Sequence, residues 1–236
     1  MTGDVLSMRR YSISAKKPDK VPQVRQTAQS KGFVYDEDDP DFMITIGGDG
    51  TFLIAERECP GLPKLLVRDS LICFKCHDEP LDEMLDMVRN GDGSIMEFRK
   101  LRAVAGDREK VATNDIVIRN SDPRHALRFR LHTEGEAVGE LFIGDGIVAA
   151  TAFGSTGYFR SVTRRTIKQG FGVGFNNITE AHDPLSLPEG GRVELEVVRQ
   201  DAHLLADNDP EMFVVKEGER VVIEQADEMA RLVGHK

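Results

Sequence analysis

The stretch that decides the fold covers residues 41–57 and reads Asp41-Phe42-Met43-Ile44-Thr45-Ile46-Gly47-Gly48-Asp49-Gly50-Thr51-Phe52-Leu53-Ile54-Ala55-Glu56-Arg57. The apolar, β-branched run up to Ile46 predicts a strand, and the residues after Gly50 predict the first turns of a helix. A strand, a glycine turn and a helix in this order are typical of a phosphate site. The free N–H groups of the turn and of the helix N-terminus face the anion there.

Asp49 stands among those N–H donors, where a carboxylate would repel a phosphate that was only being bound. Its place makes chemical sense if it takes a proton from a hydroxyl that attacks the phosphate. Gly47, Gly48 and Gly50 would then let the donor phosphates approach the backbone closely. The alternative is a tight strand–helix turn with a surface aspartate.

Composition and charge narrow the classes of function. The 236-residue chain has a formal net charge of −9 and a pI of about 5.2, which argues against a nucleic-acid binder, since such proteins present a basic face. No stretch approaches the roughly 18 continuous apolar residues of a membrane span, and the N-terminus lacks the apolar core of a signal peptide. Three cysteines do not make a disulfide framework. These observations predict a soluble, cytoplasmic protein without nucleic-acid or membrane partners.

The hydrophobic pattern changes its period near residue 100. Before that point short apolar runs, at 11–14 and 65–67, alternate with expected helices at 21–31 and 81–88. Alternation of this kind favours a parallel sheet with helices on its faces. Beyond residue 100 apolar and charged residues alternate, and turn signals recur between them, as expected for an antiparallel sandwich.

The predicted fold class is therefore an α/β, Rossmann-like N-terminal domain with a parallel sheet, over residues 1–99, and a β-rich, sandwich-like domain over residues 100–236. A return of the C-terminal segment of the second domain to the first domain is left open. The cleft between the two domains is the expected ligand site.

Two further stretches place polar side chains beside apolar strands. Asn114 and Asp115 precede a strand, and these side chains can bind a base edge or ribose hydroxyls, although an ordinary turn is the alternative. Residues 145–158 lead from an apolar strand into a loop of small residues and hydroxyls. Such a loop suits a flat, polar ligand that needs backbone approach at Gly154 and Gly157, and the alternative is a buried strand with a flexible loop.

Residues 73–77, Cys73-Phe74-Lys75-Cys76-His77, match the spacing of a c-type haem attachment and contain potential zinc ligands. Neither site is expected, because haem attachment needs an exported chain and no second cluster supplies the missing zinc ligand. A redox pair of the two thiols has no other support in the sequence. We predict no metal-ligating residues.

Taken in order, these motifs resemble those of NAD kinases. The resemblance rests on Gly47-Gly48-Asp49-Gly50-Thr51, Asn114-Asp115, Asp145-Gly146 and a Gly154-Ser155-Thr156 loop with Tyr158, and it extends through Ala206-Asp207-Asn208 and residues 219–232. Lipid kinases related to diacylglycerol kinase share the first motif, so the specificity lies in the ordered set. The resemblance implies that ATP, usually with Mg²⁺, or polyphosphate phosphorylates the 2′-hydroxyl of the adenosine ribose of NAD. It also implies homodimers or homotetramers.

The resemblance implies roles for individual residues as well. Asp49 would hold or deprotonate the attacking hydroxyl, with the glycines of the turn and Thr51 at the donor phosphates. Asn114 and Asp115 would bind the adenosine part of NAD, while Asp145, followed by Gly146, would contact the nicotinamide end. The residues implied to line the nucleotide pocket are Phe74, Thr151, Gly154, Ser155, Thr156, Tyr158 and Ser161.

The chain departs from the family pattern at two segments. Residues 66–74 lack the glycines of the family's Gly-Ile-Asn turn and Gly-Phe-Leu stretch, which leaves Phe74 for the family's aromatic residue. Residues 161–165 replace a Ser-Ala-Gly-Gly segment and add Arg164 and Arg165, which either bind phosphates or end a solvated strand. These departures keep two alternatives open: a kinase of the same fold for a sugar, nucleoside or lipid hydroxyl, and a non-catalytic nucleotide-binding regulator.

Overall fold

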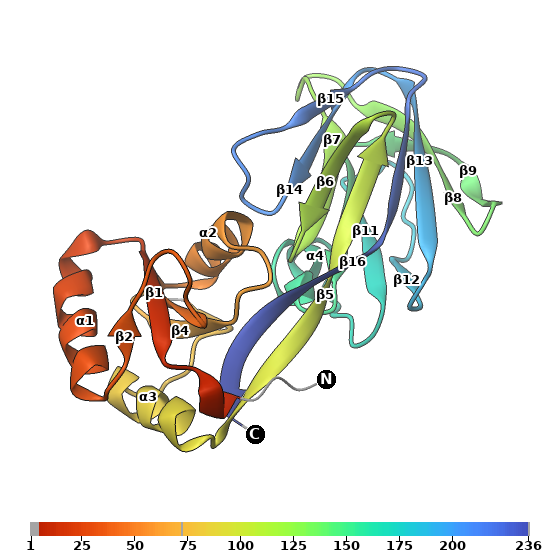
Figure 1. Ribbon diagram of the computed structural model, residues 1–236. Coiled ribbons are helices and arrows are strands. Elements are labelled where there is room, and N and C mark those ends of the chain that lie inside the picture. Colours follow the sequence, from red (N-terminus) through yellow and green to blue (C-terminus); the bar gives the residue numbers. More distant parts are fainter. Residues whose placement is uncertain (1–4, 72, 236) are drawn as a thin grey trace. The chain divides into compact units, whose positions relative to one another are not determined.

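The computed structural model describes residues 5–71 and 73–235, and the chain divides into two compact units (Figure 1). Unit 1 comprises Met1–Phe98 together with Met229–Lys236, and unit 2 comprises Arg99–Glu228. The sequence-based boundary falls at residue 100, and the contacts additionally assign the last residues of the chain to unit 1.

Unit 1 is built on a parallel sheet. Its strand order is β2 (Val34–Tyr35), β1 (Arg10–Ala15), β3 (Phe42–Gly47), β4 (Lys64–Arg68) and the C-terminal part of β16 (Arg220–His235). The last pairing is parallel and joins Leu232 to Lys64. Short 3₁₀ turns lie at η1 (Val5–Ser7) and η2 (Pro18–Lys20).

Helices cover this sheet because each has one apolar side. The helices α1 (Val21–Ser30) and α3 (Leu81–Asn90) lie side by side in Figure 1, and their buried residues share one core cluster with the sheet. That cluster includes Val24, Ala28, Met84, Leu85, Val88, Tyr11, Phe42, Ile44 and Leu65. The helix α2 (Asp49–Glu58) packs against β3 and β4 and contributes no residue to the cluster. The strands and helices predicted for this half of the chain are confirmed.

Unit 2 consists, within its described residues, of two antiparallel sheets packed face to face. One has the order β12 (Leu185–Leu187), β11 (Phe171–Asn176), β10 (Gly146–Thr151), β7 (Asp115–Asn120), β14 (Ala202–Ala206) and β15 (Phe213–Val215). The other contains the N-terminal part of β16, β13 (Arg192–Arg199), β8 (Leu127–Thr133) and β9 (Glu136–Gly144), with the C-terminal part of β5 (Gly93–Ala105) and β6 (Arg108–Ala112) beside them.

Apolar side chains of both sheets fill the space between them, including Phe129, Leu195 and Ile223 of one and Ile118, Ile147 and Val173 of the other. The outer face of the first sheet carries η3 (Gly154–Thr156) and α4 (Tyr158–Thr163), held by Phe159. The parallel sheet followed by an antiparallel sandwich is the predicted fold class, which is thereby confirmed. No helix of the described chain has the length and apolar character to cross a membrane.

The register of the first sheet of unit 2 brings three chain segments to one edge. Asp115 of β7 pairs with Ala150 of β10, and Ile116 of β7 pairs with Ala206 of β14. Because both pairings are antiparallel, the start of β7 meets the ends of β10 and β14. The loops that follow these strand ends therefore converge.

Candidate functional site

The predicted strand–turn–helix is present in unit 1. The strand β3 ends at Gly47, and α2 begins at Asp49 with Gly48 as its N-cap. A side chain at position 47 would place its Cβ 2.1 Å from Oγ1 of Thr51, so the turn requires glycine there. The Thr51 hydroxyl accepts a hydrogen bond from the Gly48 N–H at 3.4 Å, which closes the first turn of the helix.

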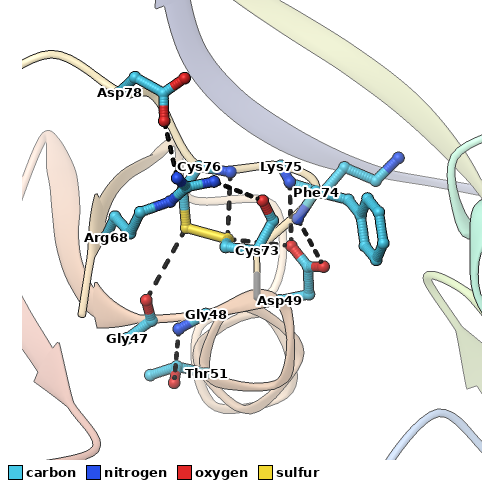
Figure 2. Close-up of a disulfide and its surroundings, with 10 residues drawn as sticks. All are labelled: Gly47, Gly48, Asp49, Thr51, Arg68, Cys73, Phe74, Lys75, Cys76 and Asp78. Carbon is cyan, nitrogen blue, oxygen red and sulfur yellow. Dashed lines mark hydrogen bonds and ion pairs between the residues drawn. A yellow bond between two sulfur atoms is a disulfide. The ribbon is translucent and has the colours of Figure 1, made fainter. Parts of the chain in front are cut away.

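The carboxylate of Asp49 is held by the segment that follows β4 (Figure 2). The N–H of Phe74 donates to its Oδ2 and the N–H of Lys75 to its Oδ1, each at 3.0 Å. Two successive backbone donors on one carboxylate fix its orientation, since charge-assisted hydrogen bonds are the strong ones. Burial lowers the pKa of the neighbouring Lys75, and the charge of Asp49 opposes that shift.

A disulfide joins Cys73 to Cys76 in this segment, with their Cα atoms 5.5 Å apart (Figure 2). The sequence left a redox pair possible but without support, and the structure shows the two sulfur atoms bonded to each other. Within the same segment the side chain of Phe74 is 63% exposed, while Cys73 is buried. The implied role of Phe74 in a nucleotide pocket stays a prediction, and its backbone N–H is the part of the residue that touches Asp49.

In unit 2 the Asn114–Asp115 motif is fixed by a residue outside the predicted set. The carboxylate of Asp207 accepts hydrogen bonds from three consecutive backbone N–H groups, those of Thr113 at 2.7 Å, Asn114 at 2.7 Å and Asp115 at 3.0 Å. The N–H of Asp207 in turn donates to the carbonyl of Asp115 at 2.9 Å. The sequence assigned no role to Asp207, because its partners are reached only through the pairing of β14 with β7.

The opposite side of the same motif is fixed by the loop after β10. The hydroxyl of Thr151 donates to the carbonyl of Thr113 at 2.7 Å, and its N–H donates to the carbonyl of Asn114 at 2.9 Å. Gly154 packs so closely that a Cβ there would lie 2.2 Å from the Asn114 carbonyl oxygen. Thr151 and Gly154 thus shape the Asn114–Asp115 turn. The Oδ1 atom of Asn114 is buried without a hydrogen-bond partner among the described residues.

Burial shifts the pKa of both carboxyl groups of this turn, Asp115 and Asp207. Burial, followed by the charge of Asp207, raises the pKa of Asp115 to about 7. Burial also raises the pKa of Asp207, but its three N–H donors and the charge of Lys100 act in the opposite direction. Burial is thus the largest cause of the raised pKa at both carboxyl groups, and at Asp207 the N–H donors oppose it.

The remaining residues of the predicted loop have different surroundings. Ser155 is buried, and its hydroxyl donates to the Ala152 carbonyl at 2.9 Å and accepts from the Ile167 N–H at 3.0 Å, so it stabilises the loop. The Tyr158 hydroxyl accepts from Nδ2 of Asn176 at 2.9 Å. A pocket of about 410 Å³ is lined by Thr156, Gly157, Arg160, Ser161 and Arg164.

Asp145 and Gly146 lie elsewhere in unit 2. They stand at the start of β10, whereas Thr151 ends that strand, a separation of about 17 Å at the rise of an extended chain. The Asp145 carboxylate accepts from Nδ2 of Asn177 at 3.1 Å and from Nδ2 of Asn120 at 3.4 Å. The structure thus groups Asn114, Asp115, Thr151 and Gly154 and leaves Asp145 outside that group.

The curated relatives of this chain include NAD kinases. No protein-family model matches the chain. An NAD kinase of Aquifex aeolicus is 29% identical over 212 residues, which cover 84% of this chain and 77% of that protein. An NAD kinase of Sulfurisphaera tokodaii is 32% identical over 145 residues, which cover 60% of this chain and 56% of that protein.

Solved structures share the fold over nearly the whole chain. An NAD kinase of Archaeoglobus fulgidus in complex with ATP has a TM-score of 0.79 at 19% identity, covering 96% of this chain and 93% of that one. A yeast NADH kinase complexed with NADH has a TM-score of 0.81 at 16% identity, covering 97% and 84%. The ordered motifs and these relatives together make the chain similar to NAD kinases over most of its length, and the solved structures show that it shares their fold.

Proposed function

We propose that this protein is an NAD kinase, which transfers a phosphoryl group from ATP to the 2′-hydroxyl of the adenosine ribose of NAD and so forms NADP. The observation that carries the proposal is the place of Asp49, at the first residue of α2 behind a glycine turn, with its carboxylate oriented by two N–H groups. Phosphoryl transfer needs little covalent chemistry from the protein, so positioning and electrostatics supply most of the rate.

Under this proposal Asp49 accepts the proton of the attacking hydroxyl, and the N–H groups of the Gly47–Thr51 turn face the donor phosphates. The turn of Asn114 and Asp115, which Asp207 and Thr151 hold in place, binds the adenosine part of NAD. The relatives support this assignment, since they are NAD kinases. Thr156, Tyr158 and Ser161 serve the dinucleotide in the same proposal, as does Asp145 at the nicotinamide end.

Mg²⁺ enters the proposed reaction with ATP. Among the described residues no group of three or more His, Cys, Asp or Glu side chains is arranged to hold a metal ion. Magnesium in kinases is bound largely through substrate phosphates, with one or two protein carboxylates. We therefore assign it to the donor phosphates, where it would neutralise charge. Polyphosphate as donor, a cytoplasmic location and a homodimeric or homotetrameric assembly belong to the same proposal.

The test is a coupled assay of the purified protein with Mg²⁺-ATP and NAD, in which an NADP-specific dehydrogenase detects the product. NADP should form, and Asp49→Asn should lower kcat by about 10²- to 10⁴-fold, the usual contribution of a positioned base. An unchanged circular dichroism spectrum must accompany that loss. Turnover retained in the variant would refute the role of Asp49.

One observation favours a second acceptor. The pocket beside Arg160 and Arg164 includes Ser161 and Arg164 of the segment that replaces small residues of the family, and no ion pair of either guanidinium is seen among the described side chains. Two such cations suit an acceptor that carries its own phosphate. If NAD yields no NADP, transfer from ATP to a phosphorylated sugar or nucleoside is the next assay. Nucleotide binding without transfer to any acceptor would indicate a regulatory module.

A further inference from the structure

The Cys73–Cys76 disulfide lies directly beside Asp49, and this proximity carries an inference about control of the reaction (Figure 2). The inference rests on the proposed role of Asp49. Sγ of Cys73 is 3.2 Å from Oδ1 of Asp49, and Sγ of Cys76 is 3.8 Å from the carbonyl oxygen of Gly47. Both sulfur atoms therefore contact the strand–turn–helix that carries the proposed base.

The disulfide contributes little to the stability of the fold. Only two residues separate its cysteines, and the stabilisation from a cross-link grows with the length of the loop it closes. Other contacts anchor the segment: Arg68 donates to the carbonyl of Cys73 at 2.8 Å and pairs with Asp78 at 2.8 Å. The ring of His77 contacts the carbonyl of Val233 at 3.1 Å. The segment thus stays attached to unit 1 without the sulfur–sulfur bond.

What the disulfide does determine is the conformation of the two residues inside its ring. These are Phe74 and Lys75, whose N–H groups donate to the Asp49 carboxylate, while the Cys76 N–H contacts Sγ of Cys73 at 3.1 Å. Opening the ring frees the backbone of both donors. It also creates a thiol at Cys73, whose S–H then faces Oδ1 of Asp49 across the same 3.2 Å.

We propose that Cys73 and Cys76 are a redox-active pair, opened by a dithiol reductant, whose disulfide form is the fast form of the kinase. In the reduced form an S–H group occupies a lone pair with which Asp49 would accept the substrate's proton. The two backbone donors lose their fixed geometry at the same time. Both changes act on the chemical step, so kcat falls while the KM for ATP stays nearly constant.

The chemistry of opening balances with the dithiol alone. A thiolate of the reductant attacks Sγ of Cys76, which is half-buried, rather than that of Cys73, which is 6% exposed and faces a carboxylate. The sulfur–sulfur bond breaks, and Cys73 leaves with the electron pair and takes a proton. The second thiol of the reductant then displaces Cys76 and closes its own disulfide. The protein gains two thiols, and the reductant is oxidised by two electrons.

Equilibration in mixtures of reduced and oxidised dithiothreitol tests the proposal through three readouts. Alkylation and mass spectrometry should show two added labels on the peptide that contains Cys73 and Cys76, whereas Cys59, a free thiol at the end of α2, is labelled in both states. NADP formation should fall about five- to tenfold in kcat on reduction, as expected for the loss of one or two oriented hydrogen bonds. Hydrogen exchange of the amides of residues 74 and 75 should accelerate.

The third cysteine supplies the matched control. Cys59→Ser should keep the full redox response, while the double variant Cys73→Ser, Cys76→Ser should turn over at the rate of the reduced protein and respond no further. A pair that opens with unchanged kcat, or a double variant that still responds, overturns the proposal. If no NADP forms in either state, the proposed function fails, and the exchange of amides 74 and 75 then decides: unchanged protection overturns control of Asp49 by the pair.

Discussion

Asp115 shows at the scale of one residue how burial can set a protonation state. Its side chain is 9% exposed and lies near the charge of Asp207, so its pKa is raised to about 7. In the unfolded chain the same carboxyl titrates near 3.8. The folded state therefore binds a proton that the unfolded state has already released between these two pH values.

The first prediction concerns this proton. Because the folded pKa is the higher one, the contribution of Asp115 to stability is complete below pH 4 and is lost as the pH rises through about 7. The whole change amounts to about 4 kcal/mol. Asp115→Asn removes it, so the free energy of unfolding of the wild type minus that of the variant should fall across this window. Urea titrations at intervals of pH measure it, and a constant difference would contradict the shift.

The second prediction concerns Asp207, which orients the Asn114–Asp115 turn without belonging to the predicted site. Asp207→Asn leaves one carbonyl oxygen for three N–H donors and turns an amide NH₂ toward them. We expect a loss of about 2–4 kcal/mol in the free energy of unfolding, measured by urea titration. The KM for NAD should rise more than kcat falls.

The matched control for this prediction is Asp209→Asn, because the carboxylate of Asp209 pairs with Lys110 of β6. That variant should keep the KM for NAD of the wild type. If a folded Asp207→Asn variant also keeps it, the turn needs no such support.

At the residue scale, the sequence predicted those site residues whose role follows from residues adjacent to them in the chain. Asp49 was predicted because its glycines stand beside it. Asp207 and the ring of Cys73 and Cys76 were not, because their partners lie far along the chain or depend on how a loop folds back. Only the pairing of strands brings Asp207 to the turn it holds.

The elements differ in how far their own sequence determines them. α1 and α3 each run over ten residues with a clear apolar side, and both were predicted. α4 covers only six residues, too few for the apolar spacing of a helix to repeat, and its Phe159 packs against Val117, Val148 and Ala150 of the sheet. Such a short helix gains its stability from tertiary contacts, so a polar loop was all that the sequence predicted there.

The third prediction concerns the contact between two loops, and it belongs to this scale. Gly154→Ala would bring a Cβ to 2.2 Å from the Asn114 carbonyl oxygen and so separate the loop after β10 from the turn before β7. We expect a loss of about 1–3 kcal/mol, together with a raised KM for NAD. Thermal melting and steady-state kinetics measure the two effects.

Gly157→Ala is the matched control in the same loop, since its Cβ would meet its nearest neighbour, the Gly154 carbonyl oxygen, at 3.3 Å. It should lower the melting temperature less than Gly154→Ala does. Equal destabilisation by both substitutions would mean that the loop resists any added side chain and that the contact with Asn114 is not special.

In the whole molecule, the strands at the ends of both strand orders have one edge that pairs with no other described strand. β9 stands at the end of one strand order and exposes Leu141, and β15 ends the other and exposes Val214. Exposed edges of this kind are templates for pairing with another chain. The pattern of sequence hydrophobicity identified the fold class but carried no information about such edges, because they depend on the order of strands in space.

The fourth prediction is that the protein assembles. Light scattering coupled to gel filtration should give a mass of two or four times the 26.2 kDa of the chain. Leu141→Lys on the edge of β9 should reduce that mass if this edge is the contact, while Leu71→Lys, at an exposed position in unit 1, should leave it unchanged. A monomer at all concentrations would contradict the assembly that the resemblance implies.

The position of β16 affects the order in which the two units can be completed during synthesis on the ribosome. Its last residues complete unit 1, where Leu232 pairs with Lys64 and Val233 enters the core, whereas residues 99–228 form unit 2 without a break. Unit 2 can therefore be finished while the sheet that was synthesised first still lacks its final strand. Domains usually fold in the order in which they are made, with the N-terminal one first. Here unit 1, whose first residues are synthesised before unit 2, is completed after it. Until its last strand arrives, the edge of β4 that pairs with β16 stays unpaired and accessible to chaperones and proteases.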